Sequence, residues 1–585
     1  MCISIFALGA LSVFAETEGY LTYRVLNGEI TITGFDKTSE ETEIIIPETI
    51  ADLPVTGIGG FAFVDCKTIT GIQLPGSIKT IGSDAFSGCI NLKSITIPDS
   101  VTTICVGAFS YCTNLENVSI PDSVTGIENY TFEGCTGLTG IILPNELSYI
   151  GHSAFYDCSS LKDITIPDKI KRIHSNTFNG CSSLTSVTIP ESVTVIGDSA
   201  FSNCSNLTDI SIPNSVTTIG NDAFSYCIKL TSVTLPDNIE EDDIYSAFYC
   251  CSGLKSINVS ENSLYYSSLN GDLYNKDKTK LIQYALGKED TEFAIPGSVT
   301  SILDDAFAGC INLKSITIPD SVTTICDGAF SYCTNLENVS IPDSVTAIRN
   351  SLFYNCSGLK NITISDKITD IGDYAFSGCI SLTEVTVPDS VTNIGHGAFS
   401  NCSNLTSINV GKDNLNYSTS DGNLYSKDKK ILLQYTAGKK DSKFTVPDFV
   451  TEIESSAFSG CANLTDIVFH NNIKGIWDNA FSDCINITNI TLPNGIDYIG
   501  YTTFSGCESL ESITIPKTVT KIQRNAFLGC ANLRTVYYLG TEEEWNSITI
   551  AKHNSELKNA DVIFVKHTET AVSGDRKTFT VNPVN

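Results

Sequence analysis

Cysteine recurs every 23 residues along most of this 585-residue chain. A period of roughly 20 to 50 residues is typical of a solenoid, whose units are too small to bury an apolar face alone and must stack on their neighbours. With Cys251 counted as the ninth, 18 units align and predict one long rod. The other aligned cysteines are Cys66, Cys89, Cys112, Cys135, Cys158, Cys181, Cys204, Cys227, Cys310, Cys333, Cys356, Cys379, Cys402, Cys461, Cys484, Cys507 and Cys530.

The aligned units follow a consensus of apolar residues broken by a proline and a glycine. One unit reads Cys181, Leu184, Val187, Ile189, Pro190, Val193, Ile196, Gly197, Ala200 and Phe201. The first apolar residues predict a short strand with alternating faces, which ends at the proline because proline lacks an N–H. A second short extended piece and one helical or 3₁₀ turn complete the unit.

Glycine, asparagine or aspartate usually precedes the cysteine, which suits a turn residue in the left-handed region. The exceptions are Tyr111, Tyr226, Tyr332 and Cys250. Either the left-handed angle is not obligatory there or these four turns are strained.

This consensus resembles the leucine-rich repeats of the BspA-like type, over about residues 42–566. The resemblance implies a mainly β repeat solenoid. Its form is a curved leucine-rich-repeat rod with a parallel sheet on the concave face and short extended or 3₁₀ turns on the convex face. It also implies a bacterial or protist surface protein, and the family's reported partners include host matrix proteins.

The ends of the chain differ from the repeats. The first residues resemble the apolar region of a secretory signal that is cleaved near Ala15, although a basic segment is missing and a buried first strand is the alternative. Alternation around Asn27 and Gly28 predicts a hairpin cap, and Thr541 and Glu544 have capping-box spacing. The expected division is a signal at 1–15, an N-terminal cap at 16–41, repeats at 42–536, a C-terminal cap at 537–566 and the start of a truncated further domain at 567–585.

Two related inserts, at about 260–295 and 411–446, interrupt the period. Each predicts a β-hairpin that turns at the sequence KDK and projects from the rod. Exposed tyrosine and lysine at such tips favour binding contacts, and residues 412–443 carry seven lysines against four acidic residues. In the alternative, the tyrosines pack on the next coil and the lysines protect a strand edge. The candidate binding residues are Tyr274, Lys276, Lys278, Tyr425, Lys427, Lys429 and Lys430.

The aligned cysteines are expected to be buried thiols because each precedes a core leucine at a fixed offset. Cys105 and Cys326 instead replace the glycine of the repeat, at a position that elsewhere takes Glu128 or Arg349 and so tolerates solvent. These two thiols and Cys250 are predicted to be the more reactive ones. No C-x-x-C spacing occurs, so neither a zinc site nor a thioredoxin-like site is supported.

The sequence supports neither nucleic-acid binding, nor a membrane span, nor a catalytic site. A formal net charge of −30 repels nucleic acid and anionic lipid. No later stretch approaches the ~18 apolar residues of a membrane span, so membrane attachment would need an anchor outside this sequence. The sequence GIGGFA at 57–62 fits a loose dinucleotide pattern but lacks the strand-to-helix setting. No catalytic, metal or cofactor site is predicted, and no enzyme activity is expected.

Outward residues of the strands, such as Ser94 and Thr96, are small, polar and nearly alike in every unit, so they form no distinctive recognition motif. The sequence favours a non-enzymatic, secreted or cell-surface module for protein interaction or adhesion. Its partner would be an unidentified protein or glycan on host or neighbouring cells. The alternative is a structural spacer that displays a downstream domain away from the cell envelope.

Overall fold

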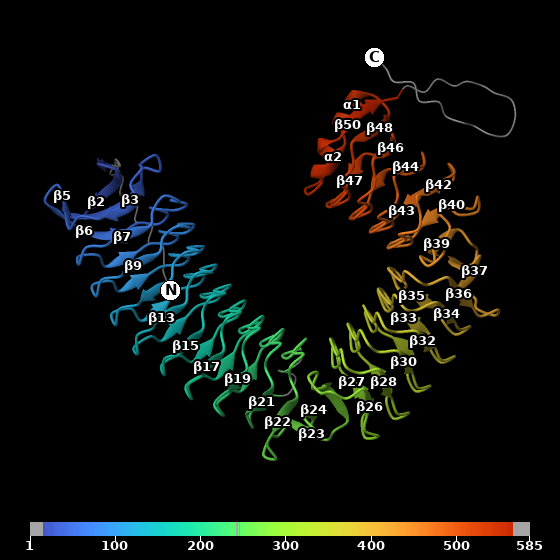
Figure 1. The fold of residues 1–585 in the computed structure, drawn as a ribbon, viewed down its shortest axis with the longest axis horizontal. Coiled ribbons are helices and arrows are strands. Elements are labelled where there is room, and N and C mark those ends of the chain that lie inside the picture. Colours follow the sequence, from blue (N-terminus) through green and yellow to red (C-terminus); the bar gives the residue numbers. More distant parts are fainter. Residues whose placement is uncertain (1–15, 241–243, 245, 566–585) are drawn as a thin grey trace. The chain divides into compact units, whose positions relative to one another are not determined.

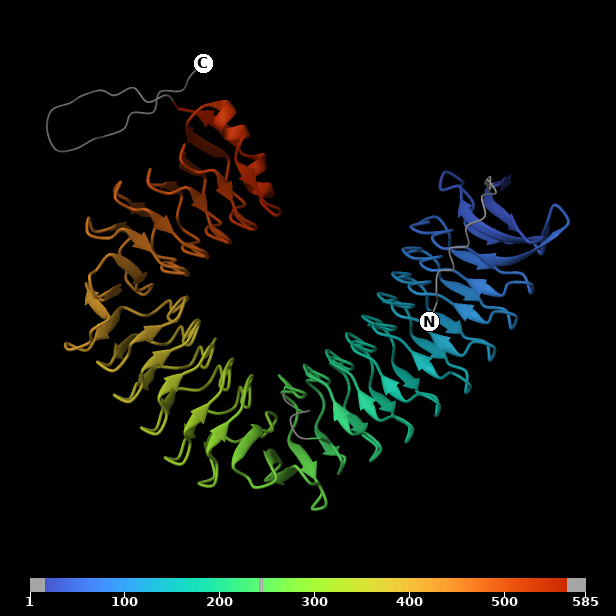
Figure 2. The same ribbon diagram turned by 180° about the vertical axis from the view of Figure 1, so that it is seen from behind.

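The computed structural model describes residues 16–240, 244 and 246–565. The chain divides into two compact units, Met1–Lys288 and Glu289–Asn585. The expected signal and cleavage site and the expected further domain at 567–585 lie outside the described residues. Figures 1 and 2 show each unit as a stack of similar thin coils, which confirms the predicted mainly β solenoid.

In the first unit, each coil contributes one strand to each of two rows. The first row contains β7 (Gly71–Gln73), β9 (Ser94–Thr96), β11 (Asn117–Ser119), β13 (Gly140–Ile142), β15 (Asp163–Thr165), β17 (Ser186–Thr188), β19 (Asp209–Ser211), β21 (Ser232–Leu235) and β22 (Ser256–Val259). The second row contains β8 (Thr80–Ile81), β10 (Thr103–Ile104), β12 (Gly126–Ile127), β14 (Tyr149–Ile150), β16 (Arg172–Ile173), β18 (Val195–Ile196) and β20 (Thr218–Ile219).

The second unit repeats this arrangement. Its first row contains β26 (Glu292–Ala294), β28 (Ser315–Thr317), β30 (Asn338–Ser340), β32 (Asn361–Thr363), β34 (Glu384–Val387), β36 (Ser407–Val410), β40 (Lys443–Thr445), β42 (Asp466–Val468), β44 (Asn489–Thr491), β46 (Ser512–Pro516), β48 (Thr535–Leu539) and β50 (Asp561–Phe564). Its second row contains β27 (Ser301–Ile302), β29 (Thr324–Ile325), β31 (Ala347–Ile348), β33 (Asp370–Ile371), β35 (Asn393–Ile394), β41 (Glu452–Ile453), β43 (Gly475–Ile476), β45 (Tyr498–Ile499), β47 (Lys521–Ile522) and β49 (Thr549–Ile550).

Strand pairing follows the sequence period. Between β17 and β19, Val187 pairs in parallel with Ile210, its counterpart one coil later. This register places equivalent residues of successive coils above one another, so the repeat leucines lie in the interior. Leu92, Leu115, Leu138, Leu161 and Leu184 are all 0% exposed.

The phenylalanine of each coil forms a second interior column. The ring of Phe178 lies 5.5 Å from that of Phe155 and 5.3 Å from that of Phe201, and both pairs are stacked. Comparable stacks connect Phe307 to Phe330 and Phe504 to Phe527 in the second unit. Stacked rings keep equal spacing only if the coils remain in register, so this column reinforces the strand pairing.

Most aligned cysteines make the same kind of thiol bond, whereas the Cys66 thiol donates to the carbonyl oxygen of Val64 in its own coil. The Cys158 thiol donates to the carbonyl oxygen of Phe132 in the preceding coil at 3.1 Å, and Cys181 does so to Phe155 at 3.2 Å. Burial raises the pKa of the Cys89 and Cys135 thiols to about 12. The cysteine is therefore a small buried residue that also satisfies a phenylalanine carbonyl from the coil before.

The residue before the cysteine is left-handed even where the sequence departs from glycine, asparagine and aspartate. The φ angles of Tyr111, Tyr226, Tyr332 and Cys250 are 57°, 58°, 58° and 55°. The angle is therefore imposed by the turn, and these four residues adopt it at a cost of order 1–2 kcal/mol each. A second left-handed position, occupied by Tyr130 and Tyr374 in two coils, takes glycine, asparagine, aspartate or serine in most others, as at Asn176 and Gly397.

Different structures stand at the two ends of the repeats. At the N-terminal end lie β1 (Glu16–Glu18), β2 (Leu21–Leu26), β3 (Glu29–Phe35), β4 (Glu43–Ile45), β5 (Thr49–Ile50) and β6 (Leu53–Ile58), and β2 and β3 form an antiparallel hairpin. At the other end lie helices α1 (Glu542–Asn546) and α2 (Ser555–Asn559). The expected capping box is present, because Thr541 and Glu544 exchange side-chain and backbone hydrogen bonds. Trp545 packs edge-on against Tyr538 at 5.2 Å.

Candidate interaction site at the two inserts

Each insert is a three-stranded antiparallel unit. The strands are β23 (Tyr266–Leu269), β24 (Asp272–Asn275) and β25 (Lys280–Gln283) in the first insert, and β37 (Tyr417–Ser420), β38 (Asn423–Ser426) and β39 (Ile431–Gln434) in the second. The expected hairpin at KDK joins the last two strands of each insert. An additional tight turn joins the first two strands, at Asn270-Gly271 and Asp421-Gly422, where both residues have positive φ. Such turns match the twist of antiparallel strands.

The sequence predicts that each insert projects from the rod. The second insert instead pairs with a strand of its own unit. Its last strand, β39, pairs in parallel with β41, so that Ile431 lies opposite Glu452. The Tyr435 ring stacks on Phe458 at 5.3 Å and so extends the phenylalanine column. The insert therefore forms part of the solenoid, because its apolar side chains are buried in the same core as those of the repeats.

The insert tyrosines lie in the core. Tyr274 and Tyr425 are each 1% exposed, and burial raises the pKa of Tyr425. Their expected role as surface contacts is therefore wrong, and the alternative, that they pack against the coils, holds. Burial of these two rings adds apolar contact area between the short insert strands and the adjacent coils, which stabilises the insert.

The candidate lysines are held by local partners. The Lys276 ammonium donates to the carbonyl oxygens of Glu261 and Ser263 at 2.9 and 2.5 Å. In the second insert, the Lys427 ammonium donates to the carbonyl of Asn414. Both lysines are nevertheless exposed, so each anchors a neighbouring loop and still presents a positive charge at the surface.

The remaining tip lysines differ in exposure, and only Lys430 is exposed. Lys278 and Lys429 are half-buried and have φ angles of 58° and 61°. The Lys429 ammonium lies 5.8 Å from the centre of the Phe449 ring. Lys430 lies 3.4 Å from the Asp428 carboxylate, which offsets much of its charge.

Deeper in each insert, a lysine bonds to a buried polar side chain. The Lys288 ammonium lies 2.7 Å from the Asp272 carboxylate, and these side chains are 13% and 1% exposed. In the second insert, Lys439 donates to Asn423 at 2.9 Å. Breaking such a buried contact leaves an uncompensated polar group, so these residues lock the inserts in place.

Sequence reasoning missed the most exposed apolar residue of each insert. Leu264 is 68% exposed and Leu415 is 82% exposed. Each directly follows the residue whose backbone carbonyl accepts from Lys276 or Lys427, so the ammonium group is bound to the backbone next to the exposed leucine. We call Leu264, Tyr265 and Lys276 the first insert knob, and Leu415, Asn416 and Lys427 the second.

The loop that presents Leu415 is held rigidly. Asn414 is 0% exposed, its side-chain oxygen Oδ1 accepts from the N–H groups of Asn416 and Tyr417, and its side-chain NH₂ group donates to two backbone carbonyls. The loop therefore cannot turn the leucine inward without breaking four hydrogen bonds. The occurrence of leucine at the same place in both inserts was the only available signal in the sequence.

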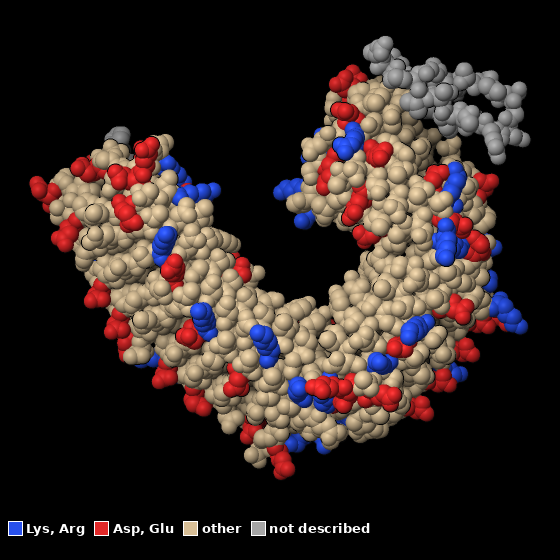
Figure 3. All heavy atoms as spheres, viewed as in Figure 1, with Lys and Arg blue, Asp and Glu red and all other residues tan. Residues whose placement is uncertain are grey.

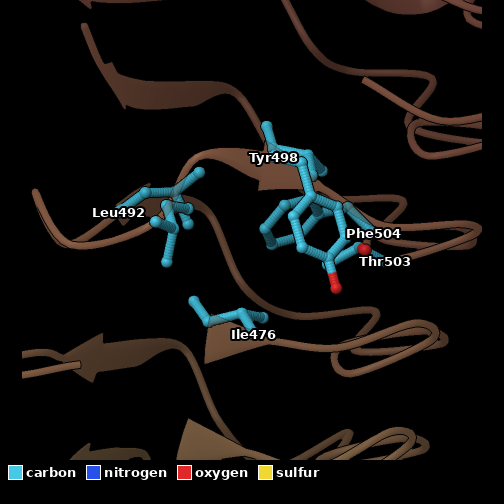
Figure 4. Close-up of a pocket in the computed structure, with 7 residues that line it drawn as sticks. Ile476, Leu492, Tyr498, Thr503 and Phe504 are labelled. Carbon is cyan, nitrogen blue, oxygen red and sulfur yellow. The ribbon is translucent and has the colours of Figure 1, made fainter. Parts of the chain in front are cut away.

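Other parts of the described chain offer little for catalysis. No group of three His, Cys, Asp or Glu residues within 16–240 and 246–565 is arranged to hold a metal ion. Figure 4 shows a gap lined by Ile476, Leu492, Tyr498, Thr503 and Phe504, but it has no room for a water molecule. On the face shown in Figure 3, acidic and basic side chains are scattered singly and in small groups. No helix in the described part is long and apolar enough to cross a membrane.

The thiols predicted to be reactive differ from the aligned cysteines in exposure. Cys105, Cys250 and Cys326 are half-buried, whereas all 18 aligned cysteines are buried. Burial nevertheless raises the pKa of Cys326, which lowers its thiolate fraction at neutral pH. Poor access and the pKa values of about 12 at aligned thiols such as Cys89 and Cys135 should both make the aligned class react more slowly.

Iodoacetamide should modify Cys105 and Cys326 in the native protein well before it modifies any aligned cysteine. A local opening that costs about 3 kcal/mol would slow the aligned thiols by ~100-fold. Mass spectrometry of digested, time-sampled reactions measures each site. Denaturation in urea before labelling provides the control, because it should make all sites react alike. Equal native rates at Cys105 and Cys158 would contradict the buried ladder.

Comparison with known proteins identifies the repeats. A family model described as a BspA type leucine rich repeat region in six copies matches residues 56–185, 171–270, 284–418 and 435–555. The chain belongs to this family. Membership of the BspA-type family is consistent with a role in protein interaction, and leucine-rich repeat proteins are generally non-catalytic. A search of curated proteins finds no match.

Several solved structures are similar to this BspA-type chain. A leucine rich cell surface protein from Faecalibacterium prausnitzii is 26% identical, with 92% of this chain and 98% of that chain covered and a TM-score of 0.38. A leucine rich repeat protein of T. pallidum is 30% identical, with coverages of 33% and 91% and a TM-score of 0.31. A leucine-rich repeat protein from Bacteroides ovatus is 24% identical, with coverages of 94% and 100% and a TM-score of 0.26.

Proposed function

We propose that this chain is a non-enzymatic, secreted or cell-surface module for protein interaction or adhesion, and that the two insert knobs contact its partner. The observation that supports the proposal is the exposed leucine beside an anchored lysine in both inserts. An apolar side chain ringed by polar groups is typical of a residue that becomes buried on binding. A surface location agrees with the cell surface relative from Faecalibacterium prausnitzii.

The knobs also provide charge complementarity to an acidic partner. The chain carries a net charge of −30, so an exposed lysine beside an exposed leucine is locally distinctive. Charge contacts of this kind mainly raise the association rate and weaken as salt rises. We therefore infer a protein partner whose contact surface combines an apolar pocket with acidic residues.

The test uses surface plasmon resonance with immobilised extracellular matrix proteins such as collagen, laminin and fibronectin. The double variant Leu264→Ser/Leu415→Ser should bind at least about tenfold more weakly than the wild type, because loss of an interface anchor costs more than about 1 kcal/mol. Ile142→Ser is the matched control, since Ile142 is 70% exposed and lies outside the inserts. Point changes are preferable to deletion of 414–440, which would remove Tyr435 from the core.

Unchanged affinity in the double variant, or an equal loss in the Ile142 control, would contradict the knobs as the binding site. If the wild type binds no member of the panel, the result counts against an interaction role and favours the structural spacer. Circular dichroism of each variant must match the wild type, so that weaker binding reports the surface and not the fold.

A further inference from the structure

The turns of the second unit enclose an open polar hollow beside the second insert. Its volume is about 230 Å³, and its walls come from turns on both sides of the insert. Across this break, the Asn401 N–H donates to the carbonyl of Ser459 at 3.2 Å, so this bond joins residues 58 apart in the sequence, whereas the same bond from Gly378 to Ser400 joins residues 22 apart. The insert thus brings the turn at Asn401 next to the turn at Ser459, and the hollow lies at this junction.

Serine, threonine and asparagine side chains make up most of the lining of the hollow. Ser456, which is 2% exposed, is one of the serines that line it. The side-chain oxygen Oδ1 of Asn401 accepts from the Ser459 hydroxyl at 3.3 Å, which holds this amide at the wall.

A carboxylate adds a strong acceptor to the same walls. Asp483 is exposed at its outer edge, yet burial raises its pKa, with the charge of Glu508 as a second cause. No lysine or arginine lines the hollow. The wall therefore favours ligands that donate hydrogen bonds and carry no negative charge.

Tyrosine rings form part of the lining. Tyr374 is 37% exposed, and its ring lies on the backbone of Gly397, where an added Cβ would be 2.7 Å from the ring atom Cε1. The neighbouring Tyr354 ring packs edge-on against Tyr332 at 5.4 Å. These contacts fix aromatic surfaces next to amide, hydroxyl and carboxylate groups.

We propose that this hollow binds one ring of a neutral oligosaccharide. A pyranose ring offers several hydroxyls that both donate and accept, together with C–H groups that pack on an aromatic ring. Drug-sized ligands occupy pockets of roughly 300 Å³ or more, so the smaller hollow suits a single ring, with the rest of the chain in solvent. The site is separate from the insert knobs and does not depend on the proposed protein contact.

The repeat itself provides variants that should preserve the fold. Asn401 and Asp483 both precede an aligned cysteine with φ of 57°, and Gly378, Gly460 and Gly506 occupy the same position in neighbouring coils. The double variant Asn401→Gly/Asp483→Gly therefore removes the polar groups and keeps the turn. Asn203→Gly is the matched control, because Asn203 has the same position and a φ of 60° in the first unit.

The aromatic contribution can be tested in the same way. Tyr374 has a φ of 54°, and Asn176 and Asn479 occupy the equivalent repeat position with φ of 59° and 57°. Tyr374→Asn thus removes the ring without a change of backbone preference. Tyr130→Asn, at the same position in the first unit, is the control.

The full chain is titrated by calorimetry and saturation-transfer NMR with lactose, maltose, cellobiose, diacetylchitobiose and the acidic 3′-sialyllactose. We expect at least one neutral sugar to bind with a Kd of about 1 mM. Both the double variant and Tyr374→Asn should weaken that binding at least about tenfold, while the two controls should not. Matrix-protein binding should be unchanged in these variants, which separates this proposal from the insert knobs.

Three results would overturn the proposal. The first is no binding of any neutral sugar up to about 20 mM. The second is wild-type affinity in the folded double variant. The third is tighter binding of 3′-sialyllactose than of lactose, because an anionic ligand is the opposite of what the Asp483 wall favours.

Discussion

Replacement of Phe178 by alanine is expected to lower the free energy of unfolding of the first unit by about 3–5 kcal/mol. Phe178 is 0% exposed, and its ring stacks between those of Phe155 and Phe201. The substitution leaves a cavity that neighbouring coils cannot fill, because strand pairing holds their spacing. Urea unfolding followed by circular dichroism gives the loss, and hydrogen exchange should locate it in the coils around residue 178.

Ile228→Ser serves as the surface control for this prediction, since Ile228 is 46% exposed in the same unit. Its effect should stay within about 0.5 kcal/mol. In a solenoid each coil contacts only its neighbours, so the damage should fade with distance along the stack. A Phe178→Ala loss no larger than that of the control would show that the aromatic column contributes little to stability.

Gly438→Ala should destabilise the second unit by about 3 kcal/mol, because it forces a side chain into backbone. A Cβ at Gly438 would lie 2.3 Å from the carbonyl carbon of Asn404 and 2.7 Å from the nitrogen of Leu405. The Gly438 N–H also donates to the Leu405 carbonyl at 2.8 Å, so the insert cannot retreat without loss of that bond. Thermal unfolding measures the effect, and hydrogen exchange across 411–446 should rise if the insert detaches.

The control for this prediction is Gly297→Ala in the same unit. A Cβ at Gly297 meets no atom within 4 Å. This change should be neutral or stabilise the protein by about 0.4–1 kcal/mol, through reduced freedom of the unfolded chain. If both substitutions had the same effect, the close approach at Gly438 would not be what fixes the insert to its coil.

Prediction from the sequence was most successful in the 23-residue repeats. One 23-residue step predicted the solenoid, the buried leucines and the buried cysteines, because every coil repeats the environment of the coil before it. The capping box at Thr541 and Glu544 was also predictable, since its hydrogen bonds are local. In both cases the relevant partner is set by sequence distance alone.

Prediction was least successful in the inserts, where no repeated neighbour defines inside and outside. Tyr425 and Leu415 illustrate the reversal: the tyrosine is 1% exposed and the leucine is 82% exposed. From residue type alone, the tyrosine would be expected at the surface and the leucine in the core. Their burial depends on which face of the insert docks on its coil, and that docking involves residues such as Gly438 and Asn404, 34 positions apart.

The amino-acid sequence by itself determined the coil, its strands, its turns and the family, because these rest on short-range spacing repeated 18 times. Only the tertiary structure decided which insert residues face solvent and where neighbouring turns separate around Asn401 and Asp483. The physical reason is that these features arise from contacts across a break in the period. There, the position of one segment against another is set by packing and hydrogen bonds that no spacing in the sequence encodes.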